Sequence, residues 1–226
     1  MKQRLQRLKG RIDDALHTSG RRDGVTVVAV GKTQPAKRLL TAYRLGIRHF
    51  GENYVQEALE KQDALAHCDI TWHFIGPVQS NKTRLIAGRF HWVHSVDRLK
   101  IARRLNDQRP DWLPPLNVFL QVNVSGEASK AGVAPEQLKE LASAVMQLPR
   151  LRLRGLMTLP APSESVEVQR RSFRYLRQLR DSLPGDLEEL SMGMSADLEA
   201  AIAEGATMIR IGTDIFGPRR GSQTSK

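Results

Sequence analysis

The chain has 226 residues, of which 40% are hydrophobic, and its 35 Lys and Arg against 24 Asp and Glu give a formal net charge of +11. This length allows a buried core without disulfides, and the single cysteine, Cys68, excludes a disulfide framework and a cysteine-based zinc site. Residues 1–16 are charged throughout, and no run approaches the roughly 18 apolar residues of a membrane-spanning helix. We therefore expect a cytoplasmic protein without membrane contact.

The clustered arginines lie on stretches with helical spacing, which is typical of solvated helix faces. Aromatic residues make up only 5% of the chain and do not interleave with these arginines, as binding to single-stranded nucleic acid would favour. Nucleic acid is therefore not the expected partner, and a basic module that binds polyanions is the weakest of three functional interpretations. The clusters comprise Arg4, Arg7 and Arg11, then Arg103 and Arg104, then Arg170, Arg171, Arg174, Arg177 and Arg180.

The chain begins with a predicted amphipathic helix, in which Leu5, Leu8, Ile12 and Leu16 form an apolar stripe. Short apolar runs then alternate with stretches of helical spacing. The runs predict strands at 25–30, 47–51, 70–76, 92–96, 116–124, 151–159, 187–193 and 206–212. The intervening stretches predict helices at 35–45, 54–66, 81–87, 97–106, 135–148, 165–183 and 196–204.

This alternation predicts parallel strands joined by right-handed crossovers. Eight consecutive units match a closed (β/α)8 barrel of the TIM type with an extra N-terminal helix, and a doubly wound open sheet is the alternative. No linker rich in Pro, Gly or Ser divides the chain, so we predict a single domain over 1–226. Its polar end, 218–226, is expected to be disordered.

Lys32 is the most informative candidate, because the carboxyl ends of the strands build the site in this fold. Strand alternation places Val28, Val30 and Lys32 on one face of the first strand. A lysine that continues an apolar inward face directs its amine into the barrel mouth, where it can condense with an aldehyde. The alternative is a lysine that reaches solvent at the strand end.

Two loops after the last two strands predict a phosphate site. The segment SMGMS (191–195) precedes a helix for which Ser195 is the expected N-cap, and IGTD (211–214) supplies a glycine that lets backbone N–H groups approach an anion. Barrels often bind phosphate with the loops after strands 7 and 8. The alternative is that Ser195 only caps its helix and Gly212 only makes a turn. The spacing of metal ligands is absent from the sequence.

Arg210 shares a strand face with Met208 and Gly212 and is expected to point into the barrel. A buried guanidinium needs a partner or a ligand. Opposite a pyridine ring, it would keep the ring nitrogen unprotonated. An internal ion pair with Glu52 or Asp214 is an equally acceptable interpretation.

His73 is also expected to face inward, because it alternates with Trp72 and Phe74 along a predicted strand. A lone histidine in such a position is more often a satisfied core residue than a proton carrier. Asn53 follows the second strand and is either a ligand-binding side chain or a cap for the helix that follows it.

Seven segments in order along nearly the whole chain carry a family resemblance. The chain resembles the pyridoxal 5′-phosphate (PLP) homeostasis proteins, which are related to the N-terminal barrel of alanine racemase. In many relatives a serine stands where this chain has Gly31, whereas Lys32 is retained. The segments are AVGKTQP (29–35), FGENYVQEAL (50–59), WHFIGPVQSNK (72–82), VHSVD (93–97), QVNVSGEASKAGV (121–133), GLMT (155–158) and LSMGMSADLEAAIAEGATMIRIGTDIFG (190–217).

The resemblance implies a monomeric fold-type III PLP barrel that serves intracellular PLP (vitamin B6) and amino-acid homeostasis without established catalytic turnover. Apo forms of PLP-dependent enzymes are the protein partners it suggests. By the same resemblance, Lys32 holds PLP as an internal aldimine and Arg210 is the partner of the pyridine nitrogen. The remaining cofactor-binding residues would be Ser191, Met192, Gly193, Ser195, Gly212 and Thr213 at the phosphate, and Asn53 and His73 near the ring.

A PLP-dependent amino-acid racemase is the alternative function. A racemase needs two bases on opposite faces of the substrate carbon, commonly a lysine and a tyrosine. The three tyrosines, Tyr43, Tyr54 and Tyr175, all lie in predicted helices, and we expect no second domain after the eighth strand. The sequence therefore favours a binding protein over an enzyme.

Overall fold

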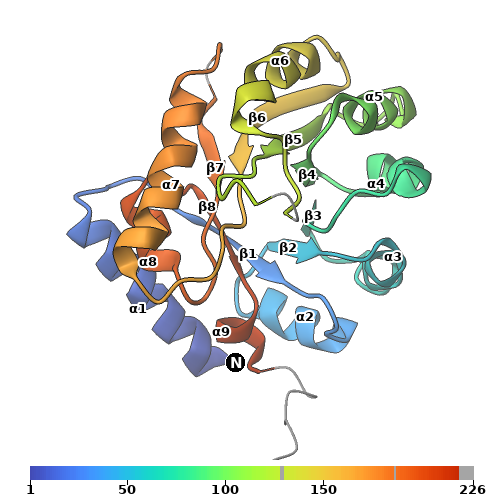
Figure 1. Ribbon diagram of the computed structural model, residues 1–226. Helices are drawn as coiled ribbons and strands as arrows, with labels where there is room; N and C mark the ends of the chain where they lie inside the picture. Colours follow the sequence, from blue (N-terminus) through green and yellow to red (C-terminus); the bar gives the residue numbers. More distant parts are fainter. Residues whose placement is uncertain (128–129, 186, 219–226) are drawn as a thin grey trace, which may run out of the picture.

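The computed structural model describes residues 1–127, 130–185 and 187–218 and shows a closed barrel of eight parallel strands in sequence order (Figure 1). β1 pairs with both β2 and β8, so the sheet closes on itself and the open doubly wound sheet is wrong. The expected disordered segment 218–226 lies outside the described residues except for Pro218. The strands are β1 Thr26–Val30, β2 His49–Glu52, β3 Thr71–Phe74, β4 Trp92–Val96, β5 Leu116–Gln121, β6 Leu151–Met157, β7 Glu189–Ser191 and β8 Met208–Ile211.

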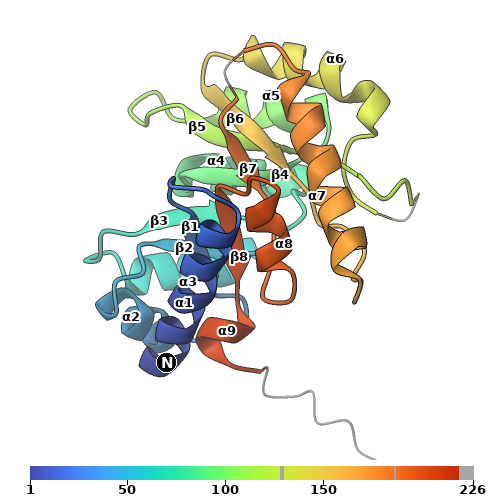
Figure 2. The same cartoon turned by 90° about the vertical axis from the view of Figure 1, so that its left-hand side faces the viewer.

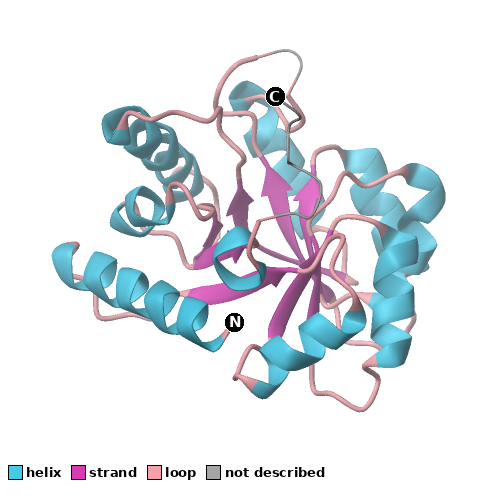
Figure 3. Cartoon of the chain, turned by 90° about the horizontal axis from the view of Figure 1, so that it is seen from below, coloured by secondary structure: helices cyan, strands magenta, loops and turns pink. Residues whose placement is uncertain are grey.

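Helices surround the strands on the outside, which Figure 3 shows in a view from below. None of the helices in the described ranges is both long and apolar enough to cross a membrane. The helices are α1 Lys2–Thr18, α2 Ala36–Arg44, α3 Val55–Ala64, the 3-10 turn η1 Ser80–Lys82, α4 Thr83–Arg89, α5 Leu99–Gln108, α6 Pro135–Met146, α7 Val166–Asp181, α8 Leu198–Ala203 and α9 Thr213–Phe216.

The predicted elements are confirmed, with shifted ends. The strand predicted to reach residue 124 ends at Gln121, because Val122 makes only an isolated bridge with Val133 before the chain turns away. The helix predicted at 196–204 begins at Leu198. The short helix α9 was not predicted, since four residues are too few to show helical periodicity.

Alternation along the strands separates two apolar layers, as expected for side chains of period two. Val28, Phe119, Met157 and Met208 form a small cluster inside the barrel. Ala29, the neighbour of Val28 along the strand, belongs to the larger layer between the sheet and the helices. The face of β1 that leads to Lys32 is therefore the inner one, as predicted.

The N-terminal helix α1 packs against α8 and α9, next to the end of the barrel that carries the loops after β7 and β8 (Figure 2). Its predicted stripe is confirmed, with Leu8 and Ile12 buried and Leu5 and Leu16 partly buried against the core. The helix thus covers the seam where the barrel closes.

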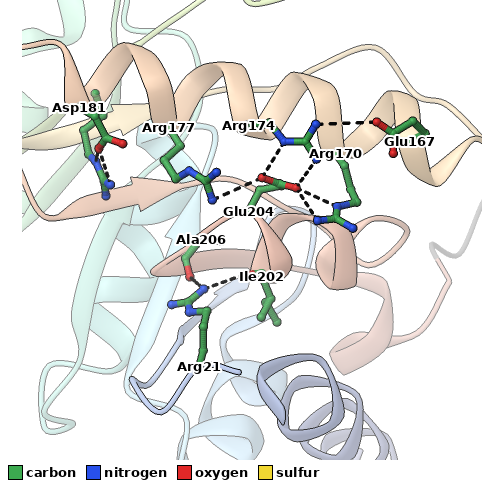
Figure 4. Close-up of polar contacts among 10 residues, drawn as sticks. Arg21, Glu167, Arg170, Arg174, Arg177, Asp181, Ile202, Glu204 and Ala206 are labelled. Atoms are coloured by element: carbon green, nitrogen blue, oxygen red, sulfur yellow. Dashed lines mark hydrogen bonds and ion pairs between the residues drawn. The ribbon is translucent and has the colours of Figure 1, made fainter. Parts of the chain in front are cut away.

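The arginines of α7 have a structural partner that the sequence did not indicate. Glu204, which is 1% exposed, lies 2.8 Å from Arg170, 3.0 Å from Arg174 and 3.4 Å from Arg177 (Figure 4). Three positive charges thus converge on one buried carboxylate and join α7 to the end of α8. These arginines are not simply a solvated helix face.

Candidate functional site

Lys32 lies two residues after the end of β1, at the carboxyl end of the barrel, and is half-buried. The strand pairing brings β8 alongside, with Val28 opposite Arg210. A Cβ placed on Gly212 would lie 3.7 Å from Cβ of Val30. The lysine and the loop after β8 are therefore neighbours at the same edge of the barrel.

Lys61 of α3 anchors the backbone immediately before Lys32. Its Nζ donates hydrogen bonds to the oxygen of Gly31 at 2.7 Å and to Oε1 of Glu52 at 2.8 Å, and both charged side chains are buried. A Cβ at residue 31 would lie 2.4 Å from the same carboxylate oxygen. Glycine thus allows the close approach of the β1–α2 loop to Glu52.

Glu57 anchors the backbone on the other side of Lys32. Its Oε1 accepts hydrogen bonds from Nζ of Lys61 and from the backbone N–H of Thr33, both at 2.6 Å. Thr33 has a φ of 63°, an uncommon conformation for a β-branched residue. The segment that carries Lys32 is therefore held from both sides.

Arg210 points into the barrel, as predicted, and is almost completely buried. Its Nη1 donates to Oγ of Ser191 at 2.6 Å and its Nη2 donates to the oxygen of Thr158 at 2.8 Å. Burial lowers the pKa of Arg210 to about 10, and the charge of Asp197 partly opposes this. The guanidinium thus remains charged at neutral pH.

The ion pairs suggested for Arg210 are wrong. Glu52 pairs with Lys61, because it lies on the helix side of the barrel wall. Asp214 pairs instead with Arg11 of α1 at 2.5 Å. Arg210 therefore sits in the barrel with neutral hydrogen-bond acceptors.

His73 is fully buried and faces inward, as expected. Its Nε2 lies 3.0 Å from Nδ1 of His49, and its Nδ1 lies 2.9 Å from Nε2 of His94. Burial lowers the pKa of His73 well below its ordinary value, so the ring is neutral. Because both ring nitrogens have protein partners, the alternative of a satisfied core histidine describes it better than a contact with a cofactor ring.

Ser195 lies in the turn between β7 and α8 and is half-buried. The prediction that it caps the helix is wrong, because α8 begins at Leu198 and Asp197 occupies the N-cap position. Oδ1 of Asp197 accepts the N–H of Met194 at 2.6 Å and closes the turn before the helix. The Ser195 side chain is therefore not engaged as a helix cap.

The first half of the SMGMS segment is buried. The hydroxyl oxygen of Ser191 accepts a hydrogen bond from Arg210, so this residue supports the arginine and is not open toward the loops. The N–H of Met192 donates to the oxygen of Met208 at 3.1 Å. Gly193 has a φ of +95°, and a Cβ there would lie 2.6 Å from Cβ of Ala201. These three residues shape the loop that presents Ser195.

Arg11 of α1 joins the two loops after β7 and β8. Its guanidinium donates to the backbone oxygen of Ser195 at 3.0 Å, to both carboxylate oxygens of Glu199 at 2.6 and 2.9 Å, and to Oδ2 of Asp214 at 2.5 Å. Thr213, at the start of α9, is exposed beside this contact. One side chain from the N-terminal helix therefore sets the spacing between the loops.

Asn53 follows β2 and is half-buried. It does not cap α3, because Tyr54 is in the N-cap position and no side chain of the described ranges caps that end. Its Oδ1 is buried and has no hydrogen-bond partner within the described residues. A buried amide oxygen without a hydrogen bond destabilises the fold. The Asn53 side chain is therefore suited to accept a hydrogen bond from a ligand.

The structure thus gathers Arg210 on β8 with Lys32, Gly212 and Thr213, which follow the carboxyl ends of the adjacent strands β1 and β8. Ser195 lies on the neighbouring loop after β7. Sequence reasoning missed His94 and Arg11. The alternation of Trp92 with His94 was a signal for the histidine, whereas nothing in the sequence links Arg11 to a residue 184 positions away. Among the described residues, no group of three or more His, Cys, Asp or Glu side chains is placed to hold a metal ion.

Residues 4–220 match the family described as alanine racemase, N-terminal domain. The chain is 59% identical over 217 residues to the pyridoxal phosphate homeostasis protein of Pseudomonas aeruginosa, covering 95% of this chain and 94% of that one. It is 51% identical over 225 residues to the Escherichia coli protein of that name, covering 95% of each. PipY of Synechococcus elongatus, solved with PLP bound, has a TM-score of 0.84 and 36% identity, covering 96% of this chain and 99% of PipY. The chain belongs to the family of pyridoxal phosphate homeostasis proteins.

Proposed function

We propose that this protein binds PLP at the carboxyl end of its barrel and serves PLP homeostasis. The observation that carries this proposal is the pairing of β1 with β8, with Val28 opposite Arg210. It brings a half-buried lysine and an anion-compatible loop to one edge of the barrel, with a buried arginine below them. Bound PLP supplies an aldehyde that forms a covalent bond with a lysine amine, and Lys32 is the residue we assign to it.

The phosphate is assigned to the loops after β7 and β8. The side chains of Ser195 and Thr213 are available there, and the lack of a Cβ on Gly212 lets an anion approach the backbone. The short helix α9 begins directly after this glycine, which is the arrangement many barrels use for phosphate. Met192 and Gly193 contribute by shaping the first loop.

The ring is assigned to the carboxyl end of the barrel, with Arg210 and Asn53 as the residues that would contact it. Among the described residues, Arg210 has only neutral acceptors within hydrogen-bond distance, and a guanidinium can donate to an unprotonated pyridine nitrogen. Asn53 offers a buried oxygen without a partner. His73 is not included, because its two nitrogens bind other histidines.

We further propose that the protein holds and releases PLP without acting as a racemase. Two of its tyrosines, Tyr43 and Tyr175, lie within helices outside the barrel, while Tyr54 precedes α3 and is exposed, contrary to the helical position predicted for it. The relatives are named for homeostasis and not for a reaction. Apo PLP-dependent enzymes are the partners we propose for release.

We also propose a monomeric, single-domain protein of the cytoplasm. All eight strands of the described residues belong to one barrel, which supports one domain. The single cysteine, Cys68, is free and half-buried, as is usual in a reducing compartment.

Replacing Ser195 with Asp tests the phosphate assignment. A carboxylate beside the phosphate repels it, so we expect the affinity for PLP to fall at least about tenfold while that for pyridoxal changes little. The matched control is Ser195→Asn, which has nearly the same shape without the charge. Equilibrium dialysis measures both ligands, and an equal loss for PLP and pyridoxal would show that the phosphate binds elsewhere.

A further inference from the structure

Five polar side chains form a hydrogen-bonded line across the inside of the barrel. His49 Nδ1 lies 3.0 Å from His73 Nε2, and His73 Nδ1 lies 2.9 Å from His94 Nε2. His94 Nδ1 lies 2.8 Å from the hydroxyl of Ser191, and that hydroxyl accepts a hydrogen bond from Arg210. The line therefore runs from the first residue of β2 to the arginine assigned to the cofactor ring.

Aromatic rings enclose the line. The ring of Trp92 stacks on His73 at 5.6 Å, and the ring of Phe119 lies 4.6 Å from that of His94. Both histidines are 0% exposed, in a place where barrels are usually filled by branched apolar side chains. Polar groups in such surroundings are costly unless each one is hydrogen-bonded. Here both ring nitrogens of His73 and both ring nitrogens of His94 have hydrogen-bond partners.

The hydrogen bonds have a direction. A guanidinium only donates, so Ser191 must accept from Arg210 and has its own proton to give. Burial lowers the pKa of both His73 and His94 well below the ordinary value, so both rings are neutral and each has one donor and one acceptor. If Ser191 donates to Nδ1 of His94, each histidine in turn donates from Nε2 to the next, ending at His49. The opposite direction would deprive the serine proton of its acceptor.

We propose that His94 and Ser191 are positioning residues that aim the guanidinium of Arg210 at the cofactor ring. Nη1 is held by Ser191 and Nη2 by the oxygen of Thr158, and two bonds from different nitrogens fix the plane of the fork. The remaining N–H groups are then directed consistently toward the ligand. Ser191 keeps its oxygen directed at Arg210 only while its hydroxyl donates a hydrogen bond to Nδ1 of His94. This inference rests on the proposed binding of PLP.

The test compares PLP with its 1-deaza analogue, in which a C–H group replaces the ring nitrogen. We expect Ser191→Ala and His94→Leu to weaken PLP binding about tenfold and to leave the affinity for the deaza analogue nearly unchanged. His94→Gln keeps a donor group and an acceptor group at this position and should restore PLP binding to within about twofold of the original protein. His67→Gln, at an exposed histidine outside the barrel, is the control.

Equal loss of affinity for both ligands would overturn the proposal, because a general disturbance of the pocket does not distinguish the ring nitrogen. No loss for either ligand would overturn it as well. Circular dichroism and melting curves show whether each variant folds. If Ser191→Ala does not fold, His94→Leu and His94→Gln still provide the comparison.

A second measurement needs no cofactor. In the apo protein, ¹⁵N NMR of the imidazole nitrogens should show that His94 is protonated on Nε2. The chemical shift of its Nδ1 should reflect the hydrogen bond from Ser191 and should change in Ser191→Ala. Protonation on Nδ1 would contradict the proposed direction. If the original protein shows the expected tautomer and yet binds neither PLP nor its analogue, the proposed function fails while the hydrogen-bonded line stands.

Discussion

Arg11 of α1 donates a hydrogen bond from Nη2 to the backbone oxygen of Ser195 at 3.0 Å, and its Nη1 lies 2.5 Å from the carboxylate of Asp214. An N-terminal helix that precedes the barrel thus reaches the two loops assigned to phosphate. Its contacts determine how far apart these loops lie.

Replacing Arg11 with Met should therefore weaken PLP binding about tenfold, because the loops lose the side chain that joins them. Arg7→Met is the control, since Arg7 is exposed on the same helix and its loss removes the same charge. Isothermal titration with PLP and pyridoxal measures the effect. If both variants lose the same affinity for PLP, the positive charge of α1 as a whole supports binding and the specific contacts of Arg11 do not.

Glu204→Gln should lower the free energy of unfolding by about 2 kcal/mol, because it leaves Arg170, Arg174 and Arg177 close together without their buried counter-charge. PLP affinity should stay within about twofold, since the cluster lies between α7 and α8 and outside the proposed site. Urea denaturation measures the stability. The matched control is Glu167→Gln, which removes an exposed partner of Arg174 and should cost little. Equal losses in the two variants would show that burial of Glu204 contributes nothing.

The buried histidines predict a specific acid sensitivity. The pKa of His94 in the folded protein lies well below 6.5, so below pH 6.5 the unfolded chain binds a proton that the folded protein does not. Stability therefore falls as the pH falls, by about 1.4 kcal/mol per pH unit for each such histidine. We expect the free energy of unfolding of the apo protein to fall between pH 6 and pH 5 in both proteins. The fall should be smaller in His94→Gln than in the original chain, by about 1.4 kcal/mol.

Glu52 acts in the opposite direction in the same range. Burial raises its pKa from 4.5 to about 7, so the folded protein retains a proton there that the unfolded chain releases, and stability falls as the pH rises. Glu52 is present in both proteins of the histidine comparison and cancels from it. An unchanged pH slope in His94→Gln would mean that His94 is protonated in the fold.

A fourth prediction concerns turnover. PLP-loaded protein incubated with L- or D-alanine in deuterated water should give no product of inverted configuration carrying deuterium at Cα. The physical reason is that Tyr43, Tyr54 and Tyr175 all lie outside the barrel interior, so none of them is placed there as a second base. Inverted, deuterated alanine that disappears in Tyr54→Phe would identify the exposed Tyr54 as that base and establish a racemase.

Period-two alternation predicted the inward directions of His73 and Arg210 and the inner face of β1, because these depend only on local strand geometry. The partners of those residues could not be predicted. Thr158, which accepts from Arg210, is 52 residues away, and its contact depends on how the strands are staggered around the barrel. Ser195 was misplaced as a cap because a serine and an aspartate two residues apart are both good N-cap residues, and Asp197 takes the position.

Borohydride reduction followed by peptide mass mapping shows whether Lys32 carries PLP. Reduction fixes the lysine-bound cofactor, and we expect its mass on the peptide that contains Lys32, with loss of the label and of the visible absorbance in Lys32→Ala. Lys82→Ala, at the end of η1, should label normally. A full label on another lysine with Lys32 unmodified, or full absorbance retained in Lys32→Ala, would show that a different residue holds PLP.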